Sequence, residues 1–119
     1  MKGRAGEWIQ VERLAHEGWA KLTSDSSKAA QLMHLLVSRL GRNNLVEISQ
    51  KELIQLMGVS RSTVQRAIKK LIEERWIEIY RYRKPGMTNI YVVNSRVAWY
   101  GKRERISRSL FMPPIESFR

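Results

Sequence analysis

The 119-residue sequence contains no cysteine. Disulfide bonds, thiolate zinc sites and thiol catalysis are therefore excluded together. Only two histidines are present, His16 and His34, and neither has a nearby set of Cys, Asp or Glu residues at the spacing of a metal site. We therefore expect no metal and no cofactor, and we expect His34 to be a structural residue beside the apolar stripe of a helix.

Long apolar runs are also missing. No stretch approaches the roughly 18 residues that a membrane-spanning helix needs. The first ten residues carry charges without an apolar region behind them, so we expect no signal peptide and a cytosolic protein. The chain has no glycine-rich phosphate loop and no serine next to a plausible base. These absences argue against a membrane protein and against an enzyme.

Acidic residues are scarce relative to basic ones. The chain has 11 Asp and Glu against 22 Lys and Arg, which gives a net charge of +11. In a small chain this excess indicates an anionic partner, either duplex DNA, RNA or an anionic membrane surface. The hydrophobic fraction of 43% is sufficient for a core, so we expect one compact domain rather than a disordered chain.

Local signals in the middle of the chain predict a first helix and a short strand. Ser26 or Ser27 can cap a helix whose apolar residues recur at helical spacing, and Gly41 closes it. The segment Leu45–Ile48 then has the composition of a short strand.

A pair of helices follows directly. Ser49 and Glu52 have the spacing of a capping box, which marks a helix start. Gly58 supplies the stop for this helix. Ser60 can cap a further helix over 61–75. The short connection between the two helices is typical of a helix-turn-helix.

The next segment predicts a β-hairpin. Trp76–Arg83 alternates apolar and polar residues, and Asn89–Asn94 provides a returning strand. Pro85 and Gly86 suit the two central positions of a turn between them. The order helix, strand, helix, turn, helix, hairpin is that of an α+β winged helix-turn-helix, a three-helix core with a β-hairpin wing, in which Leu45–Ile48 can add a third strand.

The second helix of the pair has the composition of a recognition helix. Val64, Ile68 and Leu71 point to one side, which we expect to be core. The other side and the first turns are polar, and in the major groove arginine can pair with guanine and glutamine with adenine. Lys69 and Lys70 could instead contact phosphates or only keep the surface soluble. The predicted DNA-binding residues of this helix are Ser60, Arg61, Ser62, Thr63, Gln65, Arg66, Lys69 and Lys70.

The wing and the C-terminal tail are also basic. Arg81, Arg83 and Lys84 lie near the expected tip of the hairpin, where a wing meets the DNA backbone or the minor groove. The tail gives two alternatives, DNA backbone contact or a solvated segment. Its candidate contacts are Lys102, Arg103, Arg105 and Arg108.

These motifs carry a resemblance to a known class. ISQKELIQLMGVSRSTVQRAIKKLIEERWIEIYR resembles the winged helices of bacterial transcription regulators and plasmid replication initiators. Downstream, NIYVVNSRVAWYGKRE (Asn89–Glu104) is similar to plasmid replication and maintenance proteins of the RepL type, with Ser95 where proline is usual. The second resemblance implies binding at a plasmid origin or control of a replication gene, without catalysis, and a replication protein as a candidate partner.

Regulators of the GntR and MarR types are further relatives of the same pattern. Too few residues follow the hairpin for the separate effector domain of a GntR-type regulator. MarR-type regulators dimerise through long flanking helices, and winged-helix proteins often bind symmetric half-sites as dimers. We therefore expect a homodimer, with its contacts among Trp8, Ile9, Trp19, Trp99, Leu110 and Phe111.

The sequence thus predicts an N-terminal extension over 1–25, a winged-helix DNA-binding domain over 26–100 and a basic tail over 101–119. The leading hypothesis is sequence-specific binding of double-stranded DNA in plasmid replication or its control. The first alternative is a transcriptional regulator that binds a promoter operator. RNA binding and a protein-interaction module are further alternatives, because the charge alone permits the former and the fold alone permits the latter.

Overall fold

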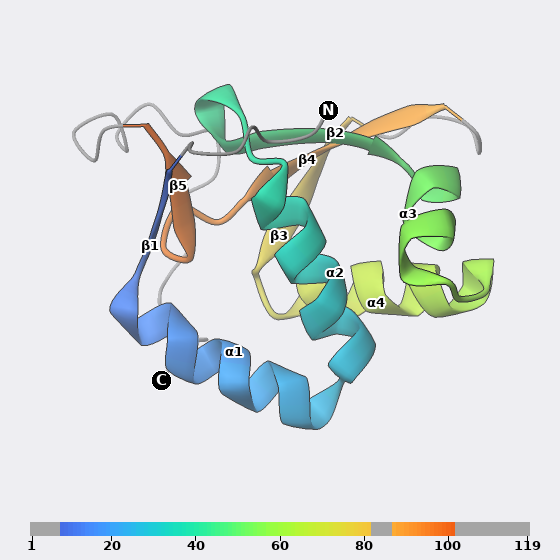
Figure 1. Cartoon of the computed structure of the whole chain (residues 1–119), viewed down its shortest axis with the longest axis horizontal. Coiled ribbons are helices and arrows are strands. Elements are labelled where there is room, and N and C mark those ends of the chain that lie inside the picture. The colour runs from blue at the N-terminus through green and yellow to red at the C-terminus, as the bar shows by residue number, and fades with distance from the viewer. Residues whose placement is uncertain (1–7, 82–86, 102–119) are drawn as a thin grey trace.

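The computed structural model describes residues 8–81 and 87–101. Figure 1 shows α3 and α4 at one end of the molecule, β1 and β5 at the other, and α2 between them. The predicted order of helix, strand, helix, turn, helix and hairpin is confirmed, and so is the α+β winged-helix class. The elements are β1 (Ile9–Val11), α1 (Arg13–Asp25), α2 (Ser27–Ser38), a short 3-10 helix (Arg42–Asn44), β2 (Leu45–Ser49), α3 (Gln50–Met57), α4 (Arg61–Glu73), β3 (Ile77–Arg81), β4 (Thr88–Val93) and β5 (Ala98–Tyr100).

Three strands form an antiparallel sheet in the order β2, β4, β3. Val46 pairs with Tyr91, and Ile77 pairs with Val93. All four side chains are almost fully buried. Alternate residues of a strand point to the same face of the sheet, and these four lie on the face that packs against the helices. The predicted hairpin therefore exists, and the predicted third strand is present with Ser49 added. The predicted turn at Pro85 and Gly86 lies outside the described residues.

The core between the sheet and the helices is built mainly by α2 and α4. Leu32, Met33 and Leu36 of α2 are at most 1% exposed, as are Val64 and Leu71 of α4. Burial of each such side chain contributes about 1.5–3 kcal/mol to stability. The predicted apolar faces of both helices are thus confirmed as core.

The predicted boundaries of α2 are nearly correct. Of the two candidate caps, Ser26 is the one used, because its hydroxyl accepts a hydrogen bond from the Ala29 N–H at 3.2 Å. The helix ends at Ser38, earlier than Gly41, because the N–H groups of Arg39 and Leu40 already bond to carbonyls only three residues back. The chain has therefore left the α-helical pattern before it reaches the glycine.

Residues 8–25, which the sequence set apart as an extension, pack into the same core. The Trp19 ring stacks on His34 with centroids 4.3 Å apart and meets Trp76 edge-on at 5.6 Å. Ala15 and Leu22 are buried beside it. Figure 1 shows α1 running across the lower end of α2, on the side of the molecule remote from β2. The expected structural role of His34 thus takes the form of an exposed ring that covers a buried tryptophan.

A second, two-stranded sheet joins the two ends of the described chain. β1 and β5 pair antiparallel, with Ile9 opposite Tyr100. The Gln10 side chain donates to the Gly101 carbonyl at 2.7 Å. The partner strand of β1 lies near the other end of the chain, so no local signal in the sequence marks this pairing.

Two residues proposed for dimer contacts are instead buried within one chain. Trp19 is 6% exposed and Trp99 is 2% exposed. Both proposals are therefore wrong for a folded monomer, since neither ring is available to a partner. Trp8 is 88% exposed and Ile9 is half-buried. Leu110 and Phe111 lie outside the described residues.

Candidate nucleic-acid interface

The geometry of the candidate interface begins with the start of α3. The Ser49 hydroxyl accepts from the Glu52 N–H at 3.0 Å, and the Ser49 N–H donates to the Glu52 carboxylate at 3.3 Å. This reciprocal pair is the predicted capping box. It fixes the point at which the chain leaves β2 and enters α3.

A tight turn then sets α4 against α3. Gly58 has a φ of 66° and its N–H bonds to the Ile54 carbonyl, so it ends α3 in the left-handed conformation that favours glycine. Ser60 caps α4 through the Thr63 N–H at 3.2 Å. The helix ends at Glu73 rather than at the predicted position 75. The helix-turn-helix is thus formed by the residues that the sequence indicated.

Helix α4 is divided into a buried and an exposed side. Val64, Ala67, Ile68 and Leu71 are buried against the core. The side chains of the opposite face are exposed to solvent, so this face is free to enter a groove. The exposed predicted residues are Ser60, Arg61, Ser62, Gln65, Arg66 and Lys69, while Thr63 is half-buried.

Short hydrogen bonds organise the front of α4. The Ser60 hydroxyl lies 3.1 Å from that of Ser62 and 3.0 Å from that of Thr63. The Arg66 guanidinium donates to the Thr63 hydroxyl at 3.3 Å. Since guanidinium has five N–H groups, Arg66 keeps donors for a guanine edge or a phosphate after this contact.

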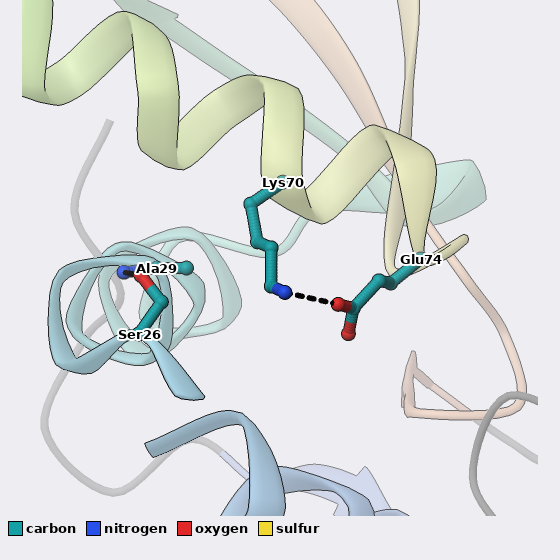
Figure 2. Close-up of polar contacts among 4 residues, drawn as sticks. All are labelled: Ser26, Ala29, Lys70 and Glu74. Atoms are coloured by element: carbon teal, nitrogen blue, oxygen red, sulfur yellow. Dashed lines mark hydrogen bonds and ion pairs between the residues drawn. The ribbon is translucent and has the colours of Figure 1, made fainter. Parts of the chain in front are cut away.

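Lys70 differs from the other predicted residues of α4. Its ammonium group pairs with Glu74, one turn further along the helix (Figure 2). Glu74 raises the pKa of Lys70, first through this hydrogen bond and then through its charge, and Asp25 at the end of α1 adds to the effect. Figure 2 shows Lys70 beside the start of α2, where Ser26 contacts Ala29. We therefore leave Lys70 out of the base-reading face.

The wing is described as far as Arg81. This side chain is exposed at the end of β3. Strand β3 pairs regularly from Ile77 to Ile79, and the register then shifts before Arg81. A bulge of this kind bends an edge strand and redirects its side chains. The predicted wing residues Arg83 and Lys84 lie outside the described residues, as do the tail candidates Lys102, Arg103, Arg105 and Arg108.

The structure adds two residues that the sequence pattern did not single out. The Gln65 amide donates to the Gln50 side-chain carbonyl at 3.4 Å, which connects the start of α3 to the front of α4. Lys51 is exposed next to Gln50. Both residues lie inside the capping box, between Ser49 and Glu52, and that position at the front of a helix-turn-helix was the available signal.

Within residues 8–81 and 87–101, no group of three or more His, Asp or Glu side chains could hold a metal ion. Over the same ranges, none of the helices has both the length and the apolar character that crossing a membrane requires.

The comparisons with known proteins agree with this geometry. The model of the MarR family matches residues 29–84, from the first turn of α2 into the wing. The fold and this match together define a winged helix-turn-helix protein, and the match supports DNA binding as the use of this fold. No curated protein and no solved structure matched the chain.

Proposed function

We propose that the protein is a transcriptional regulator that recognises an operator in double-stranded DNA by placing α4 in the major groove. The observation that carries the proposal is the front of α4, where Gln65 and Arg66 are exposed and each is held by a neighbouring polar side chain. Gln and Arg are the side chains that read adenine and guanine by paired hydrogen bonds. The MarR family match over the same helices supports regulation of transcription as the purpose of this binding.

The other contacts serve affinity rather than base choice. Ser60 and Ser62 present hydroxyls at the start of α4, where free N–H groups also favour phosphate. Lys69 continues the exposed face, and Arg81 places a charge at the wing. Arg83, Lys84 and the basic tail complete the proposed set from the sequence. A homodimer would give two such units on a symmetric site.

Replication control at a plasmid origin is the second candidate. The Val97 N–H bonds to the Asn94 carbonyl at 2.8 Å, which closes a turn over Asn94, Ser95, Arg96 and Val97. In the RepL-type pattern, proline is usual at the Ser95 position, which is the second position of this turn and the one where proline is favoured. The turn therefore supports the downstream resemblance. A replication-protein partner and a cytosolic location remain predictions from the sequence.

The proposal is tested by fluorescence anisotropy with two labelled duplexes at near-physiological salt. One duplex comes from DNA flanking the gene and the other has a random sequence. We expect a preference of about a thousandfold or more for one flanking segment. Footprinting then distinguishes a promoter operator from an origin repeat. Equal and weak binding to both duplexes would reject sequence-specific recognition, and displacement of DNA by structured RNA at equal nucleotide concentration would favour RNA as the ligand.

A substitution in α4 tests whether this helix recognises the bases. Arg66→Ala removes one paired base contact, so the preference for the specific duplex should fall by roughly tenfold or more, because such a contact discriminates by about 1–3 kcal/mol. Arg81→Ala is the matched control, because it removes the same side chain from the wing and should weaken both duplexes alike. An equal loss of specific and random binding in Arg66→Ala would remove α4 from base recognition.

A further inference from the structure

The contact between Gln50 and Gln65 gives one side chain of α4 a fixed neighbour. Gln65 lies on the exposed front of α4, and Gln50 is the first residue of α3. The Gln65 Nε2 group donates to Gln50 Oε1 at 3.4 Å. The two residues are 15 positions apart in the sequence, so the contact depends on the turn that folds α4 back against α3.

The backbone of Gln50 is well anchored. The residue directly follows Ser49, which is both the last residue of β2 and the cap of α3. Ser49 pairs with Thr88 across the sheet and exchanges two hydrogen bonds with Glu52. Gln50 is also half-buried, while Gln65 is exposed. The acceptor is therefore the more fixed of the two side chains and orients the donor.

The chemistry of the Gln65 amide then becomes selective. A carboxamide has two N–H donors and one carbonyl acceptor. With one N–H directed at Gln50, the amide retains one N–H and its carbonyl oxygen. Adenine presents the complementary pair in the major groove, with N7 as acceptor and the N6 amino group as donor. Guanine presents two acceptors there and does not match.

We infer that Gln50 is a positioning residue that holds Gln65 for the recognition of adenine. This inference rests on the proposed function, because it requires that α4 read bases in the major groove. It goes further by assigning a base to one side chain and by placing part of the specificity on α3. Gln50 acts through Gln65, so its removal changes which duplex is preferred and has little effect on the affinity for random DNA.

The test is selection of duplexes from a randomised 20-base-pair pool, followed by sequencing of the bound fraction. Wild-type protein should enrich a motif that contains an adenine, and Gln65→Ala should lose the preference at that position alone. Gln50→Met keeps the length of the side chain but removes the acceptor. It should lower the preference for adenine at the same position by about two- to tenfold, which is the range for one net hydrogen bond.

Two further variants separate positioning from direct contact. In the Gln65→Ala background, Gln50→Met should cause no additional loss of base preference, because the residue it positions is already gone. Gln50→Glu keeps a carbonyl-type acceptor at the same length, so it should retain the adenine preference while its added negative charge weakens binding to every duplex. Gln55→Met is the control, because it makes the same substitution at another, exposed glutamine of α3, and it should leave the selected motif unchanged.

The outcomes divide clearly. An unchanged motif in Gln50→Met overturns the inference. A further loss of base preference when Gln50→Met is added to Gln65→Ala also overturns it. So does an equal loss of affinity for all duplexes, which would indicate that Gln50 contacts a phosphate. Urea unfolding checks that each variant is folded. If Gln50→Met does not fold, Gln50→Ala takes its place. Wild-type protein that selects no motif overturns the proposed function itself, and the inference falls with it.

Discussion

Asn44 is the buried polar residue that ties the two sheets together. Its side chain is fully buried, and its amide donates to the carbonyls of Val93 at 3.1 Å and Ala98 at 2.7 Å. Its own carbonyl accepts from the Tyr100 N–H at 3.1 Å. One asparagine thus satisfies backbone groups at the end of β4 and at both ends of β5. It also has a φ of 59°, a conformation that asparagine tolerates better than most residues.

Asn44→Ala should therefore be strongly destabilising. Two buried carbonyls and one N–H would lose their partner at once, and we expect a loss of about 3 kcal/mol in the free energy of unfolding. Asn43→Ala is the matched control, because Asn43 also has a positive φ, 58°, but is exposed. It should lose only about 1 kcal/mol from backbone strain. Urea unfolding measures both, and equal losses would show that the buried hydrogen bonds of Asn44 contribute nothing beyond the backbone.

Arg75 is a non-glycine residue in the left-handed conformation that ends α4. Its φ is 64°, its N–H bonds to the Ile72 carbonyl, and the Trp76 N–H bonds to the Leu71 carbonyl. This pair of bonds is the Schellman motif, in which glycine is the usual residue at this position. The motif directs the chain from α4 into β3 and brings Trp76 into the core.

Arg75→Gly should raise the stability of the protein by about 0.5–1 kcal/mol, since it removes the strain of a side chain at positive φ. Glu74→Gly is the control one residue earlier, where φ is −94°. There glycine relieves no strain and removes the partner of Lys70, so the variant should be less stable than the wild type. Thermal unfolding of both variants checks the opposite signs. A loss of stability in Arg75→Gly would show that the arginine side chain makes stabilising contacts that outweigh the strain.

At the scale of the elements, the parts marked by local chemistry were predictable from sequence. The capping box at Ser49, the stop at Gly58 and the cap at Ser60 each act within a few residues, so they predict α3, the turn and α4 from sequence alone. Helix α1 has no such signal. Glu12 precedes it without a side-chain cap, and Gly18 lies in its interior. Its stability comes instead from contacts with distant residues, which a reading of local spacing does not reveal.

The candidate site shows the same division. The exposed face of α4 follows from helical periodicity, so the sequence predicted its members. The contact of Gln65 with Gln50 depends on how α3 and α4 cross, and the pairing of Lys70 depends on which rotamer reaches Glu74. Both of these contacts required coordinates. Whether the face binds DNA through these residues remains a prediction.

Trp19 tests whether α1 is an integral element of the fold. Its ring is buried against α2 and Trp76, which lies between α4 and β3, and its indole N–H donates to the Ala30 carbonyl at 3.5 Å. Trp19→Ala should lower the free energy of unfolding by about 3–5 kcal/mol, as for other large buried side chains. Trp8→Ala, at an 88% exposed tryptophan, should change it by less than about 0.5 kcal/mol. Guanidinium unfolding with circular dichroism detection compares them, and a small effect at Trp19 would mean that α1 is an appendage.

At the scale of the whole molecule, positive charge is spread unevenly along the chain. Residues 8–81 and 87–101 contain 13 basic and 8 acidic residues, a net charge of +5. The other +6 belongs to residues 1–7, 82–86 and 102–119. More than half of the net charge thus lies on these three segments. Such charge is suited to sequence-independent attraction to phosphates, whereas the front of α4 is suited to the choice of bases.

The separation between charges that attract phosphates and side chains that choose bases predicts how binding responds to salt. Neutralised phosphates release counterions, so the logarithm of the binding constant falls linearly with the logarithm of salt concentration, with a slope of about −0.9 for each phosphate contact. Arg81→Ala should reduce the magnitude of the slope by about 1 on specific and random duplexes alike, because Arg81 is proposed to contact the backbone.

Arg13→Ala is the matched control for this measurement. Arg13 is also exposed, but it lies at the start of α1, at the end of the molecule opposite α3 and α4 (Figure 1). Loss of its charge should leave the slope unchanged, since counterion release depends on the phosphates that are contacted and much less on net charge. Anisotropy titrations over a series of salt concentrations measure both slopes. Equal reductions in the two variants would mean that the protein attracts DNA through its overall charge and that the wing has no special role.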